Sequence, residues 1–239
     1  MYRALTSSVP LRKLDLIVFY MKYKEEAFTA VIVGSWNHSI FSKEWVSKYL
    51  LDGENVDVNI STQNDGKTQT IIIGESIISS TQDLSIQSKE NKFRVTAKKF
   101  DDIILQKVDD IIIKLTEYLP HTPVKAFGFN IGFSTIANDK LLKWFACPDD
   151  NKYFETNGFS LIKEKILRLF KHREYEFNVG IEKIDDKCDI GLNFHFEIDS
   201  LVSLKTLLNE KHFKDFKSES LVILNSLFNL TIDENGTVE

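Results

Sequence analysis

The chain has 239 residues, a mass of 27.6 kDa and a formal net charge of −5 at pH 7. Its hydrophobic content of 43% can fill a folded core, and 10 Gly and 4 Pro are too few for a collagen-like or linker-rich protein. The negative charge excludes a protein that is drawn to nucleic acid or to an anionic membrane by its overall field.

The N-terminal segment and the cysteines indicate a cytoplasmic protein, which we expect to be of bacterial or phage origin. The first residues lack the apolar central segment of a secretory signal. Cys147 and Cys188 are far apart and belong to no CxxC pair, which is typical of free thiols in a reducing compartment. We expect both thiols to be buried in the core.

The N-terminal part of the chain is predicted to form a hairpin and a short helix. Residues 11–22 and 28–36 are rich in apolar side chains and should pair as antiparallel strands across a polar turn at 24–26. Residues 42–51 predict a short helix, because Ser42 can cap its first turn and Gly53 follows its end.

Two more hairpins are predicted before the middle of the chain. Residues 56–60 and 68–73 read as strands, and the Asn-Asp-Gly sequence at 64–66 has the turn chemistry that tolerates positive φ. Residues 84–87 and 92–97 form a further strand pair around a polar turn.

A helix over residues 99–119 is the clearest element of the sequence. Its apolar side chains recur at three- and four-residue spacing, and Pro120 ends it. A strand over 124–133 follows, with phenylalanines on one face and small residues on the other. We expect Gly128 and Gly132 to let the long helix pack closely against the sheet.

The next segment contains the candidate domain boundary. Residues 138–146 predict a short helix, and 147–151 predict a loop that divides the chain into lobes 1–147 and 148–239, unless the two form one continuous domain. Residues 160–173 fit either a helix or a strand, and we favour a strand.

The C-terminal part predicts a hairpin and two helices. Residues 175–181 and 190–198 alternate as strands, and 201–209 and 213–230 predict helices, the second long and amphipathic. Strands followed by a long helix thus occur twice. This order predicts an α+β fold with antiparallel sheets, two long amphipathic helices packed on one face, and two related β-meander-plus-helix lobes.

The strongest polar cluster is formed by Asn193, His195 and Glu197, which alternation places on one face of a strand. A histidine beside a carboxylate suits general-base catalysis or metal binding. Two such residues make neither a coordination sphere nor a catalytic unit, so the solvated face of a sheet is favoured over an enzyme or metal site. Since no phosphate-loop, nucleophile or metal-ligand spacing occurs either, we predict no enzyme and no cofactor.

Residues 160–173 carry a basic strip that could bind the phosphates of nucleic acid. Five basic residues face one glutamate in this segment, a net charge of +4. The basic residues are Lys163, Lys165, Arg168, Lys171 and Arg173. The alternative, which we favour, is a solvated face whose charge is balanced by acidic neighbours. These neighbours are Asp101, Asp102, Asp109 and Asp110.

Aromatic residues are frequent, with 18 Phe in the chain. Trp36, Phe41, Trp45 and Tyr49 lie close together in the sequence and could line a protein interface, where aromatic side chains are enriched. A coding bias toward Phe, Ile, Lys and Asn is the alternative explanation. The leading hypothesis is a non-enzymatic protein-interaction module of the inhibitor, immunity or adaptor type, which docks through this cluster or an exposed sheet edge. Its expected partner is a protein, with a homodimer as one form.

Overall fold

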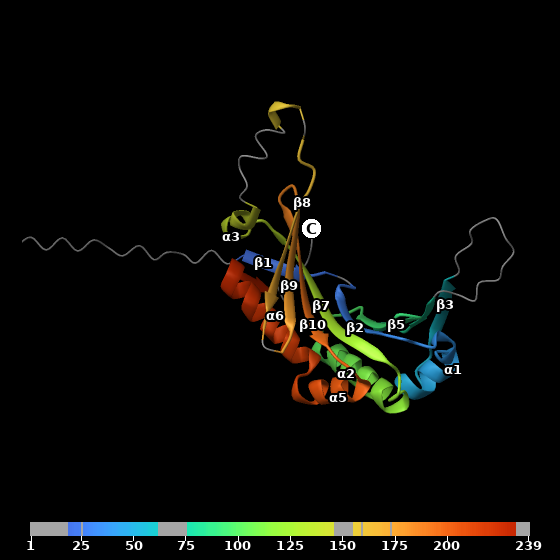
Figure 1. Ribbon diagram of the computed structural model, residues 1–239. Helices are drawn as coiled ribbons and strands as arrows, with labels where there is room; N and C mark the ends of the chain where they lie inside the picture. Colours follow the sequence, from blue (N-terminus) through green and yellow to red (C-terminus); the bar gives the residue numbers. More distant parts are fainter. Residues whose placement is uncertain are drawn as a thin grey trace, which may run out of the picture.

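The computed structural model describes residues 19–24, 26–61, 76–145, 155–158, 160–172 and 174–232. Within them eleven strands form one sheet, and Figure 1 shows helices α2 (Asp102–Tyr118), α5 (Leu201–Glu210) and α6 (Phe213–Phe228) below it. Neighbouring strands pair antiparallel, except that β1 (Phe19–Tyr23) and β11 (Leu230–Ile232) pair in parallel. The predicted α+β class with an antiparallel sheet is confirmed. In the described part of the chain, no helix has the length and apolar character that crossing a membrane requires.

Two units of similar topology make up most of the fold. The first unit spans residues 28–118 and consists of β2 (Phe28–Gly34), η1 (His38–Ile40), α1 (Lys43–Trp45), η2 (Val46–Leu50), β3 (Asp57–Ser61), β4 (Ser76–Ser80), β5 (Leu84–Lys89), β6 (Lys92–Ala97) and α2. The second unit spans residues 124–228 and consists of β7 (Val124–Ile136), α3 (Asp139–Leu142), η3 (Lys143–Phe145), β8 (Glu164–Lys171), β9 (Glu176–Ile184), β10 (Lys187–Glu197), α5 and α6.

The strand order β3-β4-β5-β6-β2-β7-β10-β9-β8 makes this repetition visible. In each unit the first strand lies at the centre of the sheet, the chain passes through short helical segments to the outermost strand, and a meander returns to the centre. A long helix then follows. The two first strands, β2 and β7, pair with each other and join the units into one sheet.

Local sequence signals fix the ends of the long helices. The Asp101 side chain accepts a hydrogen bond from the backbone N–H of Ile104 (2.8 Å) and caps α2. At the start of α6, the backbone N–H of His212 donates to Oδ2 of Asp215 (2.8 Å). Asn229, with φ of 59°, ends this helix in the left-handed conformation that terminates many helices.

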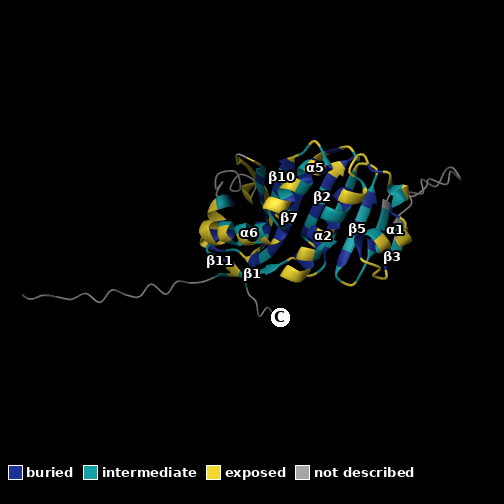
Figure 2. Ribbon diagram, turned by 90° about the horizontal axis from the view of Figure 1, so that it is seen from below, coloured by how far each residue is buried: buried dark blue, intermediate teal, exposed yellow. Residues whose placement is uncertain are grey.

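Phenylalanine rings fill the space between the helices and the sheet. Phe129 of β7 lies 5.1 Å from Phe213 and 5.3 Å from Phe216 of α6, measured between ring centroids. Phe194 of β10 lies 5.2 Å from Phe216. Figure 2 shows the helix side of the molecule, where exposed residues mark the outward surfaces of the helices. Most of the 18 phenylalanines are buried, so the core accounts for most of the aromatic content.

The predicted first hairpin is wrong in its pairing. β1 pairs with β7 and β11, and β2 pairs with β6 and β7, so β1 and β2 both run antiparallel to β7. The backbone N–H of Lys24 donates to the carbonyl of Gly132 (3.0 Å), and Glu26 has φ of 56°. The chain therefore stays beside β7 from β1 to β2 and does not fold back into a hairpin, because alternation identifies a strand but not its partner. Residues 11–18 and 25 lie outside the described residues.

The role predicted for the two β7 glycines is also wrong. Phe127 and Phe129 point toward the helices, whereas a Cβ atom on Gly132 would lie 2.5 Å from the Cβ of Ala27 on the opposite face. A Cβ on Gly128 would meet the side chain of Asn193 at 3.5 Å. Both glycines allow close approach on the helix-free face, because side chains alternate strictly along a strand.

Most other predicted elements agree with the structure in type and place. The predicted helices at 42–51, 99–119, 201–209 and 213–230 correspond to α1 with η2, α2, α5 and α6, and the ambiguous segment 160–173 contains strand β8. The hairpins β5–β6 and β9–β10 are confirmed. β3 pairs with β4, at 76–80, and not with the predicted strand at 68–73, so the predicted second hairpin has the wrong partner. The predicted turn at 64–66, the strand at 68–73 and the boundary loop at 147–151 lie outside the described residues.

Candidate functional site

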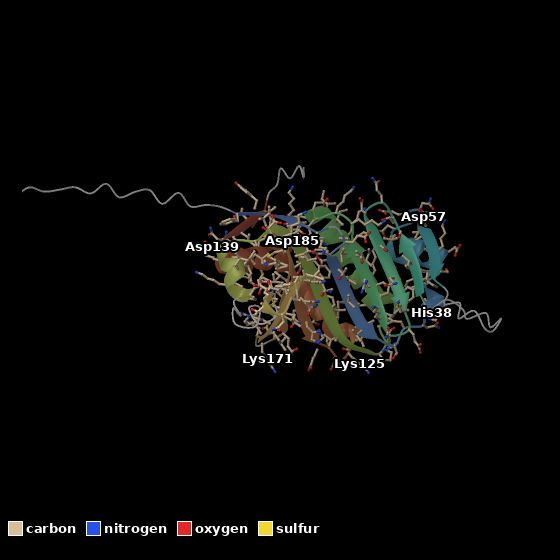
Figure 3. The ribbon with its side chains drawn as sticks, turned by 90° about the horizontal axis from the view of Figure 1, so that it is seen from above. His38, Asp57, Lys125, Asp139, Lys171 and Asp185 are labelled. Atoms are coloured by element: carbon tan, nitrogen blue, oxygen red, sulfur yellow. The ribbon has the colours of Figure 1, made fainter. Side chains whose placement is uncertain are left out.

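Helices α2, α5 and α6 lie on one side of the sheet and leave its opposite face uncovered (Figure 1). Figure 1 shows the sheet curving upward at β8 and β9 on one side and at β3 on the other. Figure 3 looks down onto this helix-free face, with His38, Lys125 and Lys171 along one of its long sides and Asp57, Asp139 and Asp185 along the other.

A row of uncharged polar residues crosses the helix-free face, one from each of seven adjacent strands. In order from β4 to β9 across the sheet, these residues are Ser80, Ser85, Thr96, Thr29, Asn130, Asn193 and Asn178. Each is the direct cross-strand partner of the next. We call this row the polar ladder.

The asparagines of the polar ladder are joined by side-chain hydrogen bonds. Nδ2 of Asn178 donates to Oδ1 of Asn193 (3.1 Å), whose Nδ2 donates to Oδ1 of Asn130 (2.7 Å). Nδ2 of Asn130 in turn donates to Oγ1 of Thr29 (2.9 Å). Because each amide nitrogen carries two N–H groups, a second donor per asparagine is not used within the ladder.

A hollow of about 440 Å³ lies beside the polar ladder. Gly132, Gly191 and Gly180 occupy neighbouring positions on three strands and leave its floor without side chains. On its rim, burial opposes ionisation of Asp189, but hydrogen bonds from Lys24 and Ser134 outweigh this effect and lower the pKa of the Asp189 carboxyl. The Asp189 carboxylate on the rim is therefore already paired with Lys24 of the same chain.

Strand β8 is the edge of the sheet in the second unit. It pairs with β9 on one side and with no further strand in the described part of the chain. Its apolar side chains are unusually exposed for a sheet, with Leu167 67%, Leu169 59% and Phe170 44% accessible, and Ile162 just before it is 82% accessible. An edge with open backbone groups and exposed apolar side chains is a template for pairing with another chain.

The predicted basic strip does not form one surface, because β8 distributes its residues over both faces. Lys163, Lys165 and Lys171 belong to the helix-free face, whereas Arg168 lies on the other face with its guanidinium carbon 3.9 Å from the ring centroid of Trp144. Arg173, the fifth predicted residue, lies outside the described residues.

The carboxylates near this strip also differ from those predicted. Nζ of Lys163 lies 2.6 Å from a carboxylate oxygen of Glu182, and Lys171 is the cross-strand partner of Glu176. Both glutamates belong to β9. The predicted acidic neighbours belong to α2 or precede it, on the side of the sheet where the helices lie.

The predicted aromatic cluster is divided between core and surface. Trp36 and Phe41 are 4% and 2% exposed and pack in the core, so they offer no surface to a partner in this structure. Trp45 and Tyr49 are half-buried, with ring centroids 5.3 Å apart, and Tyr118 of α2 joins them 5.0 Å from Tyr49. Tyr118 was not part of the predicted cluster because it lies far away in the sequence.

His195 and Glu197 lie on the helix-free face of β10, as alternation predicts, beside a shallow hollow of about 860 Å³ at the strand end. Asp199 and Ser203 also line it. Oγ of Ser203 donates to Oδ1 of Asp199 (2.6 Å), and this hydrogen bond is the main cause of the lowered pKa of Asp199. Among the described residues, no group of three or more His, Cys, Asp or Glu side chains could hold a metal ion. The side chain of Asn193, the third residue of the predicted cluster, forms hydrogen bonds within the polar ladder.

Cys188 is buried on β10, which agrees with the prediction of a core thiol, and burial raises the pKa of its thiol. Cys147 lies outside the described residues.

The amino-acid sequence matches no protein-family model and no curated protein. The fold and the site define the class of the protein: an α+β protein with one large antiparallel sheet, one helix-free face and one apolar sheet edge.

Proposed function

We propose that this protein is a non-enzymatic interaction module that docks along the edge of β8, and that the chain it docks to is a second copy of itself. The observation that carries the proposal is the exposure of apolar side chains on both faces of an edge strand. Addition of a strand to an open sheet edge is a common mode of protein recognition, in which main-chain hydrogen bonds supply affinity.

The topology of the two units supports this occupant. In chain order β8 follows the short helical segments as β3 does, but in position it is the fourth strand from the centre of the sheet, as β4 is in the first unit. β4 is covered by the antiparallel strand β3, but β8 has no equivalent neighbour in the described part of the chain. The β8 strand of a second copy would fill the position that β3 holds in the first unit.

The sequence of β8 selects one register for such pairing. In a dimer with its two-fold axis perpendicular to the sheet, the two β8 strands pair antiparallel, and directly paired residues share a face. Since side chains alternate between the faces, the residue on the axis must lie opposite its own copy. When that residue is Ile166, Glu164 lies opposite Arg168 of the copy, and Ile162 lies opposite Phe170. Because of the symmetry, each of these two pairs occurs twice. Such pairs contribute about 0.2–1 kcal/mol each.

The neighbouring registers each place like charges opposite one another. A register centred on Lys165 pairs this lysine with itself, and one centred on Arg168 pairs that arginine with itself. A register centred on Leu167 places Lys163 opposite Lys171. Like charges directly opposite each other destabilise a strand pair. Charge complementarity therefore favours the register centred on Ile166.

A charge exchange tests the register. Glu164→Arg alone should give a monomer by size-exclusion chromatography with light scattering, because arginines then face each other across the interface. Arg168→Glu alone should also give a monomer, because glutamates then face each other. An equimolar mixture of the two variants should form a heterodimer, since every arginine then lies opposite a glutamate. Val222→Lys, on the exposed surface of α6, is the control that leaves the dimer intact.

Disulfide formation gives a second measurement of the same register. Cα atoms of directly paired residues lie roughly 4.5–5.5 Å apart, within the range of a disulfide. Ile166→Cys should therefore give a covalent dimer on mild oxidation. Leu167→Cys should react much more slowly, since its copy lies on a diagonal roughly 7–8 Å away. A wild-type chain that remains a monomer at tens of micromolar, or a mixture that does not associate, would refute the proposal.

A further inference from the structure

Three basic residues lie together on the helix-free face of the first unit, and the central strands β2 and β7 lie between them and β8 in the strand order. Lys89 of β5 is the direct cross-strand partner of Lys92 of β6. Arg94 follows Lys92 on the same face of β6, and all three side chains are half-buried. We call these residues the β5–β6 basic cluster.

In the described part of the chain, the β5–β6 basic cluster is not neutralised by any ion pair. Glu90, in the turn that joins the two strands, forms no ion pair with either lysine. Nε of Arg94 is buried and has no hydrogen-bond partner among the described residues. By contrast, Lys99, just after the same hairpin, is paired with Asp83 at 2.8 Å.

The close approach of these cations carries a free-energy cost. Lysines placed directly opposite each other destabilise a strand pair. The pKa of Lys92 is lowered, first by burial and then by the charges of Arg94 and Lys89. A buried guanidinium N–H without an acceptor adds a further cost. An anion bound beside these side chains would relieve the repulsion among the three positive charges.

We infer that Lys89, Lys92 and Arg94 form a binding site for a phosphate-type oxyanion. The guanidinium of Arg94 presents parallel N–H donors that match two oxygens of such a group. A doubly charged phosphate neutralises more of the three positive charges than a carboxylate does. Gln87, the cross-strand partner of Arg94, can add an amide donor from the same face. With a net charge of −5, the chain attracts this anion through the local cluster and not through its overall field.

The test uses the full chain, with pyrophosphate and inorganic phosphate as probes and sodium chloride at matched ionic strength as the reference. In a ¹H–¹⁵N NMR titration, pyrophosphate should shift the Nε–H resonance of Arg94 and the amides of 89–94. Arg94→Gln and Lys92→Gln should each weaken binding about tenfold, the loss expected for one charge-assisted hydrogen bond. Lys140→Gln, on the exposed surface of α3, should leave binding unchanged.

A single-stranded thymidine oligonucleotide identifies the source of the phosphate. If the oligonucleotide binds more tightly than pyrophosphate and Arg94→Gln weakens both, the site binds a phosphate that belongs to a polymer. If pyrophosphate binds and the oligonucleotide does not, the site binds a small molecule. Either result supports the site. Probe shifts no larger than those of chloride, or shifts that persist in Arg94→Gln, would overturn it.

A measurement without any anion guards against misfolded variants. At low salt, Lys92→Gln should melt at a higher temperature than the wild type, because removing one charge relieves the repulsion. Added pyrophosphate should reverse this order by stabilising the wild type. Since β8 and the β5–β6 basic cluster belong to different units, the Arg168→Glu variant should keep its anion binding. Failure of the β8 proposal and failure of this one are thereby distinguishable.

Discussion

Asp109 is a buried carboxyl group that links α2 to the start of α6, and it should make stability depend on pH. It is 1% exposed and accepts a hydrogen bond from the backbone N–H of Phe213 (3.2 Å). Nδ1 of His212 lies 3.3 Å from its Oδ2. Burial raises the pKa of Asp109 to about 6, although the Phe213 N–H and His212 both favour the charged form.

The sign of the effect follows from comparing the folded and unfolded chains. The unfolded carboxyl has a pKa of 3.8, so between 3.8 and about 6 the folded state binds the proton more tightly. The stabilising contribution of Asp109 is present below pH 3.8 and is lost as the pH rises through 6. One pKa unit corresponds to about 1.4 kcal/mol, so the loss by pH 7 is about 3 kcal/mol. Asp109→Asn keeps an acceptor for the Phe213 N–H and remains uncharged, so it should avoid this loss.

Urea denaturation of the wild type and of Asp109→Asn at several values between pH 4 and pH 8 measures the effect. The difference between the two free energies of unfolding should shift in favour of the variant by about 2.4 kcal/mol between pH 4 and pH 8, because part of the effect already lies below pH 4. The comparison with the variant is needed because Asp83, Asp189 and Asp199 have lowered pKa values. Their stabilising contributions are lost as the pH falls, which is the opposite of the effect of Asp109. Repeating the comparison in a His212→Gln background separates the carboxyl from its neighbour. A constant difference from pH 4 to pH 8 would refute the reasoning.

Three further predictions concern stability and can be checked by the same denaturation measurements. Gly132→Ala should lower the free energy of unfolding by about 1–3 kcal/mol, because the new Cβ would lie 2.5 Å from that of Ala27. The control Gly191→Ala adds a Cβ with nothing within 4 Å and should cost much less, so equal losses would contradict the prediction. Asp101→Ala should cost about 1 kcal/mol by removing the cap of α2, and an unchanged midpoint would argue against the cap. Asn193→Ala should cost about 1–3 kcal/mol, because it leaves two partners in the polar ladder without a hydrogen bond; a neutral result would mean that water replaces the amide.

The secondary structure was largely predictable because its signals are local. The 3.6-residue spacing of apolar side chains identified α2 and α6, and strict alternation identified β9 and β10. The pairing of β1 was not predictable in the same way. Alternation shows which side chains share a face, but whether a strand pairs with its neighbour in sequence or with β7 depends on contacts more than a hundred residues apart.

The polar ladder corresponds to a repeated spacing of asparagine and glycine in the sequence. Asn130 and Gly132 are two residues apart, as are Asn178 and Gly180, and Gly191 and Asn193. An asparagine and a glycine on the same face of three strands suggest that the three pairs lie side by side. Only the strand order aligns them, so the hydrogen-bonded row could not be derived from one strand alone.

The ambiguity of residues 160–173 in the sequence has a physical cause in the structure. A strand with one buried face shows strict alternation, but Ile166, Leu167, Leu169 and Phe170 place apolar side chains on both faces of β8. The pattern therefore fits a helix as well as a strand. Such a strand occurs at the edge of a sheet, where apolar side chains on both faces are partly exposed, and this is the position of β8. The irregular period that obscured the secondary structure thus marks the surface that we propose for docking, because a second β8 strand would cover the edge and part of both apolar faces.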